Sequence, residues 1–190
     1  MDIENTAEWD TSLEELLGRY ADEAQCRENL HRREFYKYRR VNKCFALPVI
    51  VLSALSGSFT FISKSYKNLE EIITNITGGV SILVAIISSV SSYLKLGENQ
   101  SRHEVAEIAW QQLYNMVKHE LGLRRDLRKD PREFLETVKV AYDRLFEISP
   151  IISQSVISIV KKQVRGHADF LVPNYLNGCS HTRAFDPGDD

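Results

Sequence analysis

Cysteine is scarce in this sequence, and the common catalytic motifs are absent. The three cysteines, Cys26, Cys44 and Cys179, lie far apart and are odd in number, which is typical of a reducing compartment rather than of a disulfide framework. There is no glycine-rich phosphate loop and no Gly-x-Ser-x-Gly nucleophile motif. The segment 103–107 differs from the zinc motif His-Glu-x-x-His because Glu107 occupies the second histidine position. We therefore expect neither enzymatic activity nor a bound metal or cofactor.

Charged residues are missing from two long stretches, Cys44–Ile62 and Ile72–Leu94. At about 1.5 Å per residue, helices of about 19 and 23 residues measure roughly 28 and 34 Å, close to the ~30 Å core of a bilayer. Because unpaired backbone groups are costly in lipid, the pattern predicts a two-span transmembrane helical hairpin over residues 44–94, with spans 44–62 and 72–94. The alternative is a pair of buried helices in a soluble core.

Averages over the whole chain hide this pattern. A net charge of −2 and a mean hydropathy of −0.27 are those of an ordinary soluble domain, because strongly polar flanks offset the apolar middle. Residues 1–11 form an acidic N-terminal segment without the apolar run of a cleavable signal peptide. We therefore expect insertion to begin at the first span, which then acts as an uncleaved anchor.

A basic segment with interleaved aromatic residues precedes the first span. Its cations are Arg32, Arg33, Lys37, Arg39, Arg40 and Lys43. This composition is found both in nucleic-acid-binding surfaces and in the positively charged flank of a membrane span. Its position favours a basic belt at the lipid interface, with the bilayer rather than nucleic acid as the partner. Because the hairpin loop is charge-balanced, the positive-inside rule predicts an integral membrane protein with both termini cytoplasmic.

Small residues recur in the second span at alternating intervals of four and three. They are Thr74, Gly78, Ser81, Ala85, Ser88 and Ser92. The first span has a similar stripe, formed by Ala46, Val49, Ser53, Gly57 and Thr60. Such a stripe lets another helix approach closely. It either packs the two spans of the hairpin together or, in a homo-oligomer, lines a pore. The absence of charge in both spans argues against a proton relay or an ion-coupled transporter.

The polar flanks show helical periodicity. The apolar spacing over residues 12–43 predicts a juxtamembrane helix that starts at Ser12 and is amphipathic at first and then basic. Residues 95–165 predict a cytoplasmic helical region that follows a polar exit at Lys95–Ser101. Residues 166–190 predict an irregular C-terminal tail.

Two local signals divide the cytoplasmic region. Asp130-Pro131 is typical of a helix start, and Ser149-Pro150 of a helix end. We predict an all-α fold whose long cytoplasmic helices form an antiparallel bundle. The residues expected to pack are Trp9, Leu13, Leu16 and Tyr20 against Trp110, Leu113, Val117, Phe134, Val138, Tyr142 and Leu145.

The layout as a whole resembles the SLATT domain family. The resemblance rests on the basic helix before a two-span hairpin, on Ala106-x-x-Ala109-Trp110-x-x-Leu113-Tyr114, and on Tyr142-Asp143-Arg144-Leu145 with Ser149-Pro150-Ile151-Ile152. It covers about residues 12–165. It implies a two-transmembrane effector, associated with nucleotide-second-messenger systems, that oligomerises and forms pores on an upstream signal. This chain carries no sensor domain, so a separate sensor or complex partner is expected to supply the trigger.

Two functions of different classes follow. The first is an oligomeric pore-forming or membrane-perturbing effector that is gated through its cytoplasmic helices. The second is a structural membrane adaptor that ties a protein shell or complex to a membrane without conduction. The resemblance favours the first.

Overall fold

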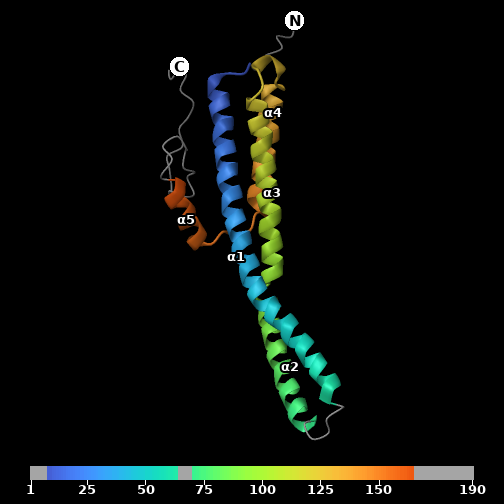
Figure 1. Ribbon diagram of the computed structural model, residues 1–190. Helices are drawn as coiled ribbons and strands as arrows, with labels where there is room; N and C mark the ends of the chain where they lie inside the picture. Colours follow the sequence, from blue (N-terminus) through green and yellow to red (C-terminus); the bar gives the residue numbers. More distant parts are fainter. Residues whose placement is uncertain (1–7, 64–69, 165–190) are drawn as a thin grey trace. The chain divides into compact units, whose positions relative to one another are not determined.

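The computed structural model describes residues 8–63 and 70–164, and within these ranges every regular element is a helix. In chain order they are α1 (Thr11–Ser63), α2 (Glu70–Tyr93), α3 (Leu96–Leu121), the short 3₁₀ helix η1 (Arg125–Leu127), α4 (Pro131–Ile148) and α5 (Gln154–Val164) (Figure 1). The prediction of an all-helical fold is confirmed for the described residues. The predicted C-terminal tail and most of the hairpin loop lie outside them.

The chain divides into two compact units. One, here called the helical unit, consists of Met1–Glu34 and Arg102–Asp190, and the other, the hairpin unit, is Phe35–Ser101. Because α1 and α3 cross these boundaries, each contributes residues to both units.

Side-chain caps set two of the helix starts. The Asp130 carboxylate accepts hydrogen bonds from the backbone N–H groups of Arg132 and Glu133, both at 3.0 Å, and Pro131 is the first helical residue, as predicted. At the start of α1, the Asp10 carboxylate accepts from the N–H of Leu13 at 2.6 Å. Asp10 rather than Ser12 therefore caps this helix.

The expected polar exit after the second span is almost absent. Only Leu94 and Lys95 separate α2 from α3, and Lys95 adopts a left-handed φ of 49°. The Asn99 side-chain amide donates to the Leu94 carbonyl at 3.3 Å, so it satisfies an acceptor exposed where α2 ends. A single left-handed residue is thus enough to end one helix and start the next.

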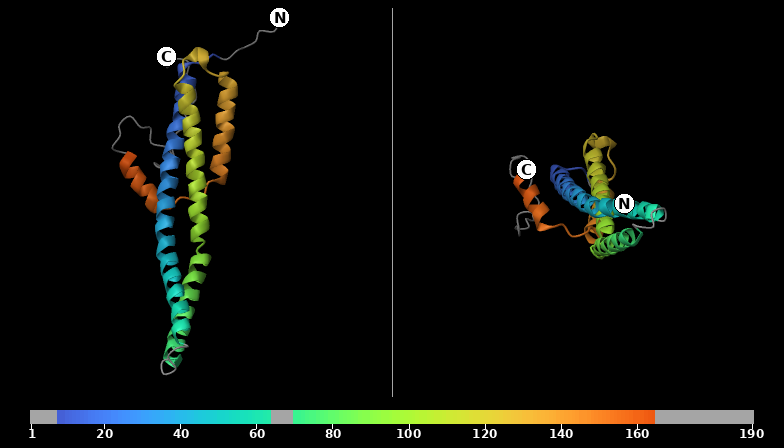
Figure 2. Two further views of the ribbon diagram at one scale, coloured as in Figure 1. Left: turned by 45° about the vertical axis from the view of Figure 1, so that its right-hand side comes forward. Right: turned by 60° about the horizontal axis from the view of Figure 1, so that its bottom comes forward.

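The core of the helical unit lies where α1, α3 and α4 run side by side (Figure 2). Its buried members are Leu17, Ala21, Ala24, Ala106, Trp110, Leu113, Val117, Phe134 and Val138. Most predicted packing residues belong to this core or pack against it, but the prediction for Leu16 is wrong. Leu16 is 40% exposed whereas Leu17 is fully buried, because one residue along a helix turns the side chain by about 100°.

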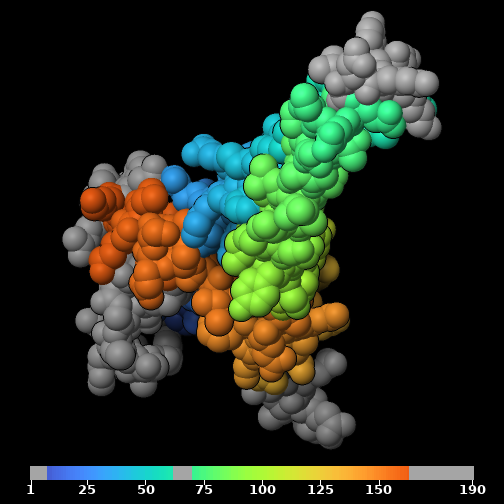
Figure 3. Space-filling view, turned by 90° about the horizontal axis from the view of Figure 1, so that it is seen from below, coloured from blue at the N-terminus to red at the C-terminus, as the bar shows by residue number. Residues whose placement is uncertain are grey.

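A second apolar cluster joins α5 to α1. The space-filling view shows α5 beside α1 (Figure 3). Cys26 and Leu30 of α1 pack against Val156 and Val160 of α5. The Glu34 carboxylate accepts a hydrogen bond from the Ser153 backbone N–H at 2.7 Å, just before α5 begins. Two features of α1 therefore hold α5 in place: the apolar contact through Cys26 and Leu30, and the Glu34 carboxylate that accepts from the residue before α5.

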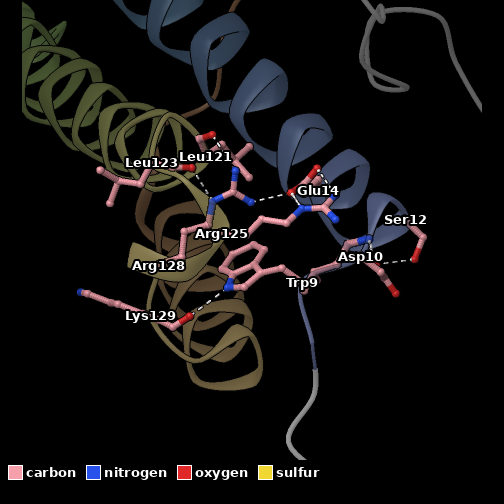
Figure 4. A network of polar contacts seen from close by, with 10 residues as sticks. Trp9, Asp10, Ser12, Glu14, Leu121, Leu123, Arg125, Arg128 and Lys129 are labelled. Carbon is pink, nitrogen blue, oxygen red and sulfur yellow. Dashed lines mark hydrogen bonds and ion pairs between the residues drawn. The ribbon is translucent and has the colours of Figure 1, made fainter.

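A polar network ties the start of α1 to the α3–α4 connection (Figure 4). The Glu14 carboxylate accepts from the Arg125 Nε at 2.8 Å and from the Arg128 Nη1 at 2.6 Å. Arg128 also donates to the Leu121 and Leu123 carbonyls, both at 2.9 Å. The Glu14 network thus supplies partners for the carbonyls that the end of α3 leaves exposed.

We expect Glu14→Gln to lower the free energy of unfolding at neutral pH by about 1 kcal/mol, since the network is partly solvent-screened. Hydrogen bonds from Arg125 and Arg128 lower the Glu14 pKa from 4.5 to about 2. Because the folded pKa is the lower one, the stabilisation is complete above pH 4.5 and is lost as the pH falls toward 2. Unfolding of the full chain in mild detergent, for the wild type and Glu14→Gln at neutral pH and near pH 2, measures the difference in unfolding free energy.

Glu15→Gln is the matched control. Glu15 is two-thirds exposed and its carboxylate lies 3.8 Å from Arg19, so its removal should change stability by less than about 0.5 kcal/mol. Equal effects of the two variants would show that the Glu14 network does not stabilise the fold.

Candidate membrane-spanning hairpin

Large apolar side chains of the hairpin unit are exposed. They are Leu47, Ile50, Val51, Leu55, Phe59 and Phe61 on α1, and Ile72, Ile76, Ile82, Leu83, Ile86 and Val90 on α2, with exposed fractions from 41% to 81%. Among the described residues, no part of either apolar window is buried, and both helices are long and apolar enough to cross a membrane. Among the described residues, these stretches therefore do not form a buried core, and contiguous exposed apolar surface marks contact with lipid or another protein.

The two helices of the hairpin face each other through half-buried residues. On α1 these recur as Phe45, Val49, Leu52 and Ser56, and on α2 as Ile73, Thr77, Val80, Val84, Ile87, Ser88 and Ser91. Intervals of three and four place each set on one side of its helix. The contact between α1 and α2 consequently combines larger apolar side chains with the small residues Ser56, Thr77 and Ser91.

The predicted small-residue stripe lies beside this contact. On α2, Thr74, Gly78, Ser81, Ala85 and Ser92 are exposed, and Ser88 is half-buried. On α1, Ala46, Ser53, Gly57 and Thr60 are exposed, and only Val49 is at the contact. Apart from Val49 and Ser88, the stripe residues therefore lie outside the contact between the two helices.

Both stripes lie on the same side of the hairpin. Nearly every small residue directly follows a contact residue in the sequence: Gly57 follows Ser56 on α1, and Gly78 follows Thr77 on α2. One residue rotates the side chain by roughly a quarter of a turn in a right-handed helix. Because α1 and α2 run in opposite directions, the same step on each turns both stripes toward one side. We call the resulting surface, residues 46, 53, 57 and 60 with 74, 78, 81, 85 and 92, the small-residue face.

Hydroxyl groups near this face are satisfied within their own helix. The Thr74 hydroxyl donates to the Glu70 carbonyl at 2.7 Å, and the Ser81 hydroxyl donates to the Thr77 carbonyl at 2.8 Å. A hydroxyl bonded in this way can face lipid or another helix without leaving an unpaired donor.

The basic belt splits between the two units. Lys37, Arg39, Arg40 and Lys43 are exposed in the hairpin unit, and Tyr36 and Tyr93 add exposed aromatic rings. The other two cations, Arg32 and Arg33, are half-buried in the helical unit.

Arg32 belongs to an ion-pair network instead. Its guanidinium donates from Nε to Glu107 at 2.8 Å and also bonds Glu28. The four cations of the hairpin unit are therefore better placed than Arg32 to meet lipid head groups.

Sequence reasoning missed the polar groups that line the inside of the helical unit. The Arg27 guanidinium lies over the Trp110 ring at 5.1 Å and over the Phe146 ring at 4.7 Å, and the Tyr142 hydroxyl donates to Glu23 at 2.5 Å. Burial, with the bond to Glu23 as the second cause, raises the Tyr142 pKa. Glu23 and Arg27 interrupt the apolar periodicity of α1. The hydrophobic pattern by itself therefore does not show that these two residues face the inside of the unit.

The residues of the near-zinc motif have different surroundings. His103 is buried, Glu104 is exposed, and Glu107 pairs with Arg32. Across the described ranges, no group of three or more His, Cys, Asp or Glu side chains is arranged to hold a metal ion. Comparisons of the chain with protein-family models, curated proteins and solved structures find no match.

Proposed function

We propose that this chain is an integral membrane protein whose α1–α2 hairpin crosses a bilayer and assembles with other copies into a pore-forming or membrane-perturbing oligomer. One observation carries the proposal. The small-residue face is exposed on one side of the hairpin, whereas large side chains such as Leu83 and Ile86 lie on other sides of α2.

Packing energetics explain why this division suits an oligomer in lipid. Large apolar side chains gain little by leaving lipid tails, so helix association in a bilayer depends on close van der Waals contact. Gly57 and Gly78 allow the closest backbone approach, and the hydroxyl oxygens of Thr74 and Ser81 add weak polarity to the same face. Several copies that meet through this face place weakly polar groups around a common axis, as a conduit requires.

The flanking residues support the orientation predicted above. Four exposed cations precede the first span, and Tyr36 and Tyr93 lie close to the polar ends of the spans in sequence. This is the composition of a cytoplasmic membrane interface, which would place both termini in the cytoplasm. The resemblance to the SLATT family points to the same function, with a separate sensor or complex as the source of the trigger.

A structural adaptor is the second candidate, and an open groove favours it. A cavity of about 790 Å³ lies between α3 and α4 and is lined by apolar side chains, including Met116 and Val140, with Glu136 and Arg144 among its polar residues. Grooves of this kind accept a helix from a partner protein. In an adaptor this groove would dock the complex that the hairpin anchors.

Ion flux through liposomes that contain the purified full chain, together with its mass in mild detergent, tests the first function. We expect a defined oligomer of more than two subunits and flux above that of protein-free liposomes. Two to four helices rarely enclose a pore, so a monomer or dimer would contradict the proposal. A larger oligomer that conducts no ions, even when the complex it belongs to is present, would favour the structural adaptor.

A further inference from the structure

Two histidines face each other inside the helical unit. His31 of α1 and His103 of α3 are 0% and 2% exposed, and their Nδ1 atoms lie 3.0 Å apart. The other ring nitrogen of His31, Nε2, is buried and has no hydrogen-bond partner among the described residues. The contact joins positions 72 apart in the sequence and forms part of the seam between α1 and α3.

This geometry limits the protons that the pair can hold. A hydrogen bond between two Nδ1 atoms needs one donor and one acceptor, so the contact accommodates a single shared proton. Buried N–H groups without a partner are rarer than buried acceptors without one. We therefore assign the proton on Nδ1 to His31, which leaves its buried Nε2 as a bare acceptor and places the proton of His103 on Nε2.

The surrounding charges come mainly from the helices that form the seam. Burial is the largest cause that lowers the His31 pKa, to about 3, and His103 and Arg27 act in the same direction, whereas Glu34 opposes them. Arg102 and Glu104, on either side of His103, are exposed. Next to His31 on α1, Arg32 pairs with Glu28 and with Glu107 of α3, and Glu34 bonds the Ser153 N–H just before α5.

We propose that the His31–His103 pair is a proton-sensitive contact that holds α1, α3 and α5 together at neutral pH and releases them at mildly acidic pH. A proton added at the bare Nε2 of His31 would create an imidazolium in a buried site near Arg27, with an N–H that has no hydrogen-bond partner among the described residues. Opening of the seam would relieve this cost. The effect reaches α5 because His31 lies one helical turn from both Arg27 and Glu34, and Glu34 bonds the Ser153 N–H.

Proton linkage sets the size of the effect. The folded pKa of His31 lies below its ordinary value of 6.5, so the closed form is favoured above pH 6.5 and weakens as the pH falls toward 3. A site with these two values opens about thirty-fold more often at pH 5.0 than at high pH. This expectation concerns the helical unit alone and holds whatever the hairpin does in a membrane.

Cys26 provides a native probe of this opening. It is 2% exposed and is covered by Val156 and Val160 of α5. In a Cys44→Ser, Cys179→Ser background, we expect labelling of Cys26 by a pyridyl disulfide to accelerate about thirty-fold between pH 7.5 and pH 5.0. The full chain is held in mild detergent, and each rate is divided by that of the denatured protein at the same pH.

Variants separate the pair from other titrating groups. His31→Gln with His103→Gln keeps a hydrogen-bonding pair that cannot titrate, so its labelling should change less than about twofold between the two pH values. His119→Gln, at an exposed position on α3, should keep the full pH dependence. A wild-type rate that does not change with pH, or an equal acceleration in the double glutamine variant, would overturn the proposal.

Histidine NMR of the wild type keeps the proposal testable if the double variant does not fold. We expect the rings of His31 and His103 to stay in the assigned neutral tautomers until Cys26 becomes reactive. Titration of His31 near 6.5 while Cys26 remains protected would contradict it.

Discussion

Replacement of Gly78 by leucine should dissociate the oligomer and abolish flux, whereas replacement of the adjacent Gly79 should leave both intact. Gly78 lies on the small-residue face, and Gly79 is turned by about 100° from it toward the side that carries Ile76 and Leu83. Leucine at position 78 would separate backbones that the proposed assembly brings into close contact. At position 79 it would add one more large side chain to a lipid-facing surface.

The two glycines are closely matched in the single chain. Within the described residues, a Cβ added at either position meets no atom within 4 Å. Both substitutions also raise helix propensity by a similar amount, about 1 kcal/mol. Any difference between the variants must therefore come from contacts outside the chain itself.

Subunit dissociation in detergent and flux in liposomes measure the result. We expect Gly78→Leu to weaken association at least about tenfold, equivalent to about 1.4 kcal/mol, and to reduce flux in proportion. Gly57→Leu, on the same face of α1, should act as Gly78→Leu does. Equal behaviour of the position 78 and position 79 variants would show that the small-residue face is not the interface.

Replacement of Trp110 by alanine should cost about 3–5 kcal/mol of unfolding free energy, the largest loss expected for any single residue in the helical unit. Trp110 is fully buried between α1, α3 and α4. Its indole N–H donates to the Ser149 hydroxyl at 2.8 Å, and that hydroxyl donates to the Leu145 carbonyl at 2.6 Å. Alanine would create a cavity and remove both the ring under Arg27 and the donor to Ser149.

Three further variants separate the contribution of the hydrogen bond from that of ring packing in the loss of unfolding free energy. Trp110→Phe keeps a ring but loses the hydrogen bond, and Ser149→Ala removes the acceptor, so each should cost about 1–2 kcal/mol. Val105→Ala, at a position 61% exposed on the same helix, should change stability by less than about 0.5 kcal/mol. Chemical unfolding of the full chain in mild detergent can be followed by the fluorescence of Trp9, which contacts the same core. A loss in Trp110→Ala no larger than that in Val105→Ala would refute the assigned core.

Local signals in the sequence predicted the helices and most of their ends. Two stretches without charge predicted two long apolar helices, and the carboxylate and ring of Asp130-Pro131 predicted the start of α4. Signals of this kind depend only on residues that are close in the sequence, so they can be recognised without knowing which helices pack together. They were less exact where adjacent residues offered similar chemistry, as with Asp10 and Ser12 at the start of α1.

The sequence by itself determined that this protein is helical and contains two apolar stretches long enough for a bilayer. Only the tertiary structure decided that Leu17 rather than Leu16 enters the core, that Arg32 pairs with Glu107, and that His31 meets His103. It also decided that most residues of the predicted small-residue stripe lie beside the α1–α2 contact rather than within it. The physical reason is that helix formation depends on neighbouring residues, whereas the partner of a side chain depends on the rotation and register of helices far apart in sequence. A step of one residue turns a side chain by about 100°, which is enough to move it from a buried contact to an exposed face.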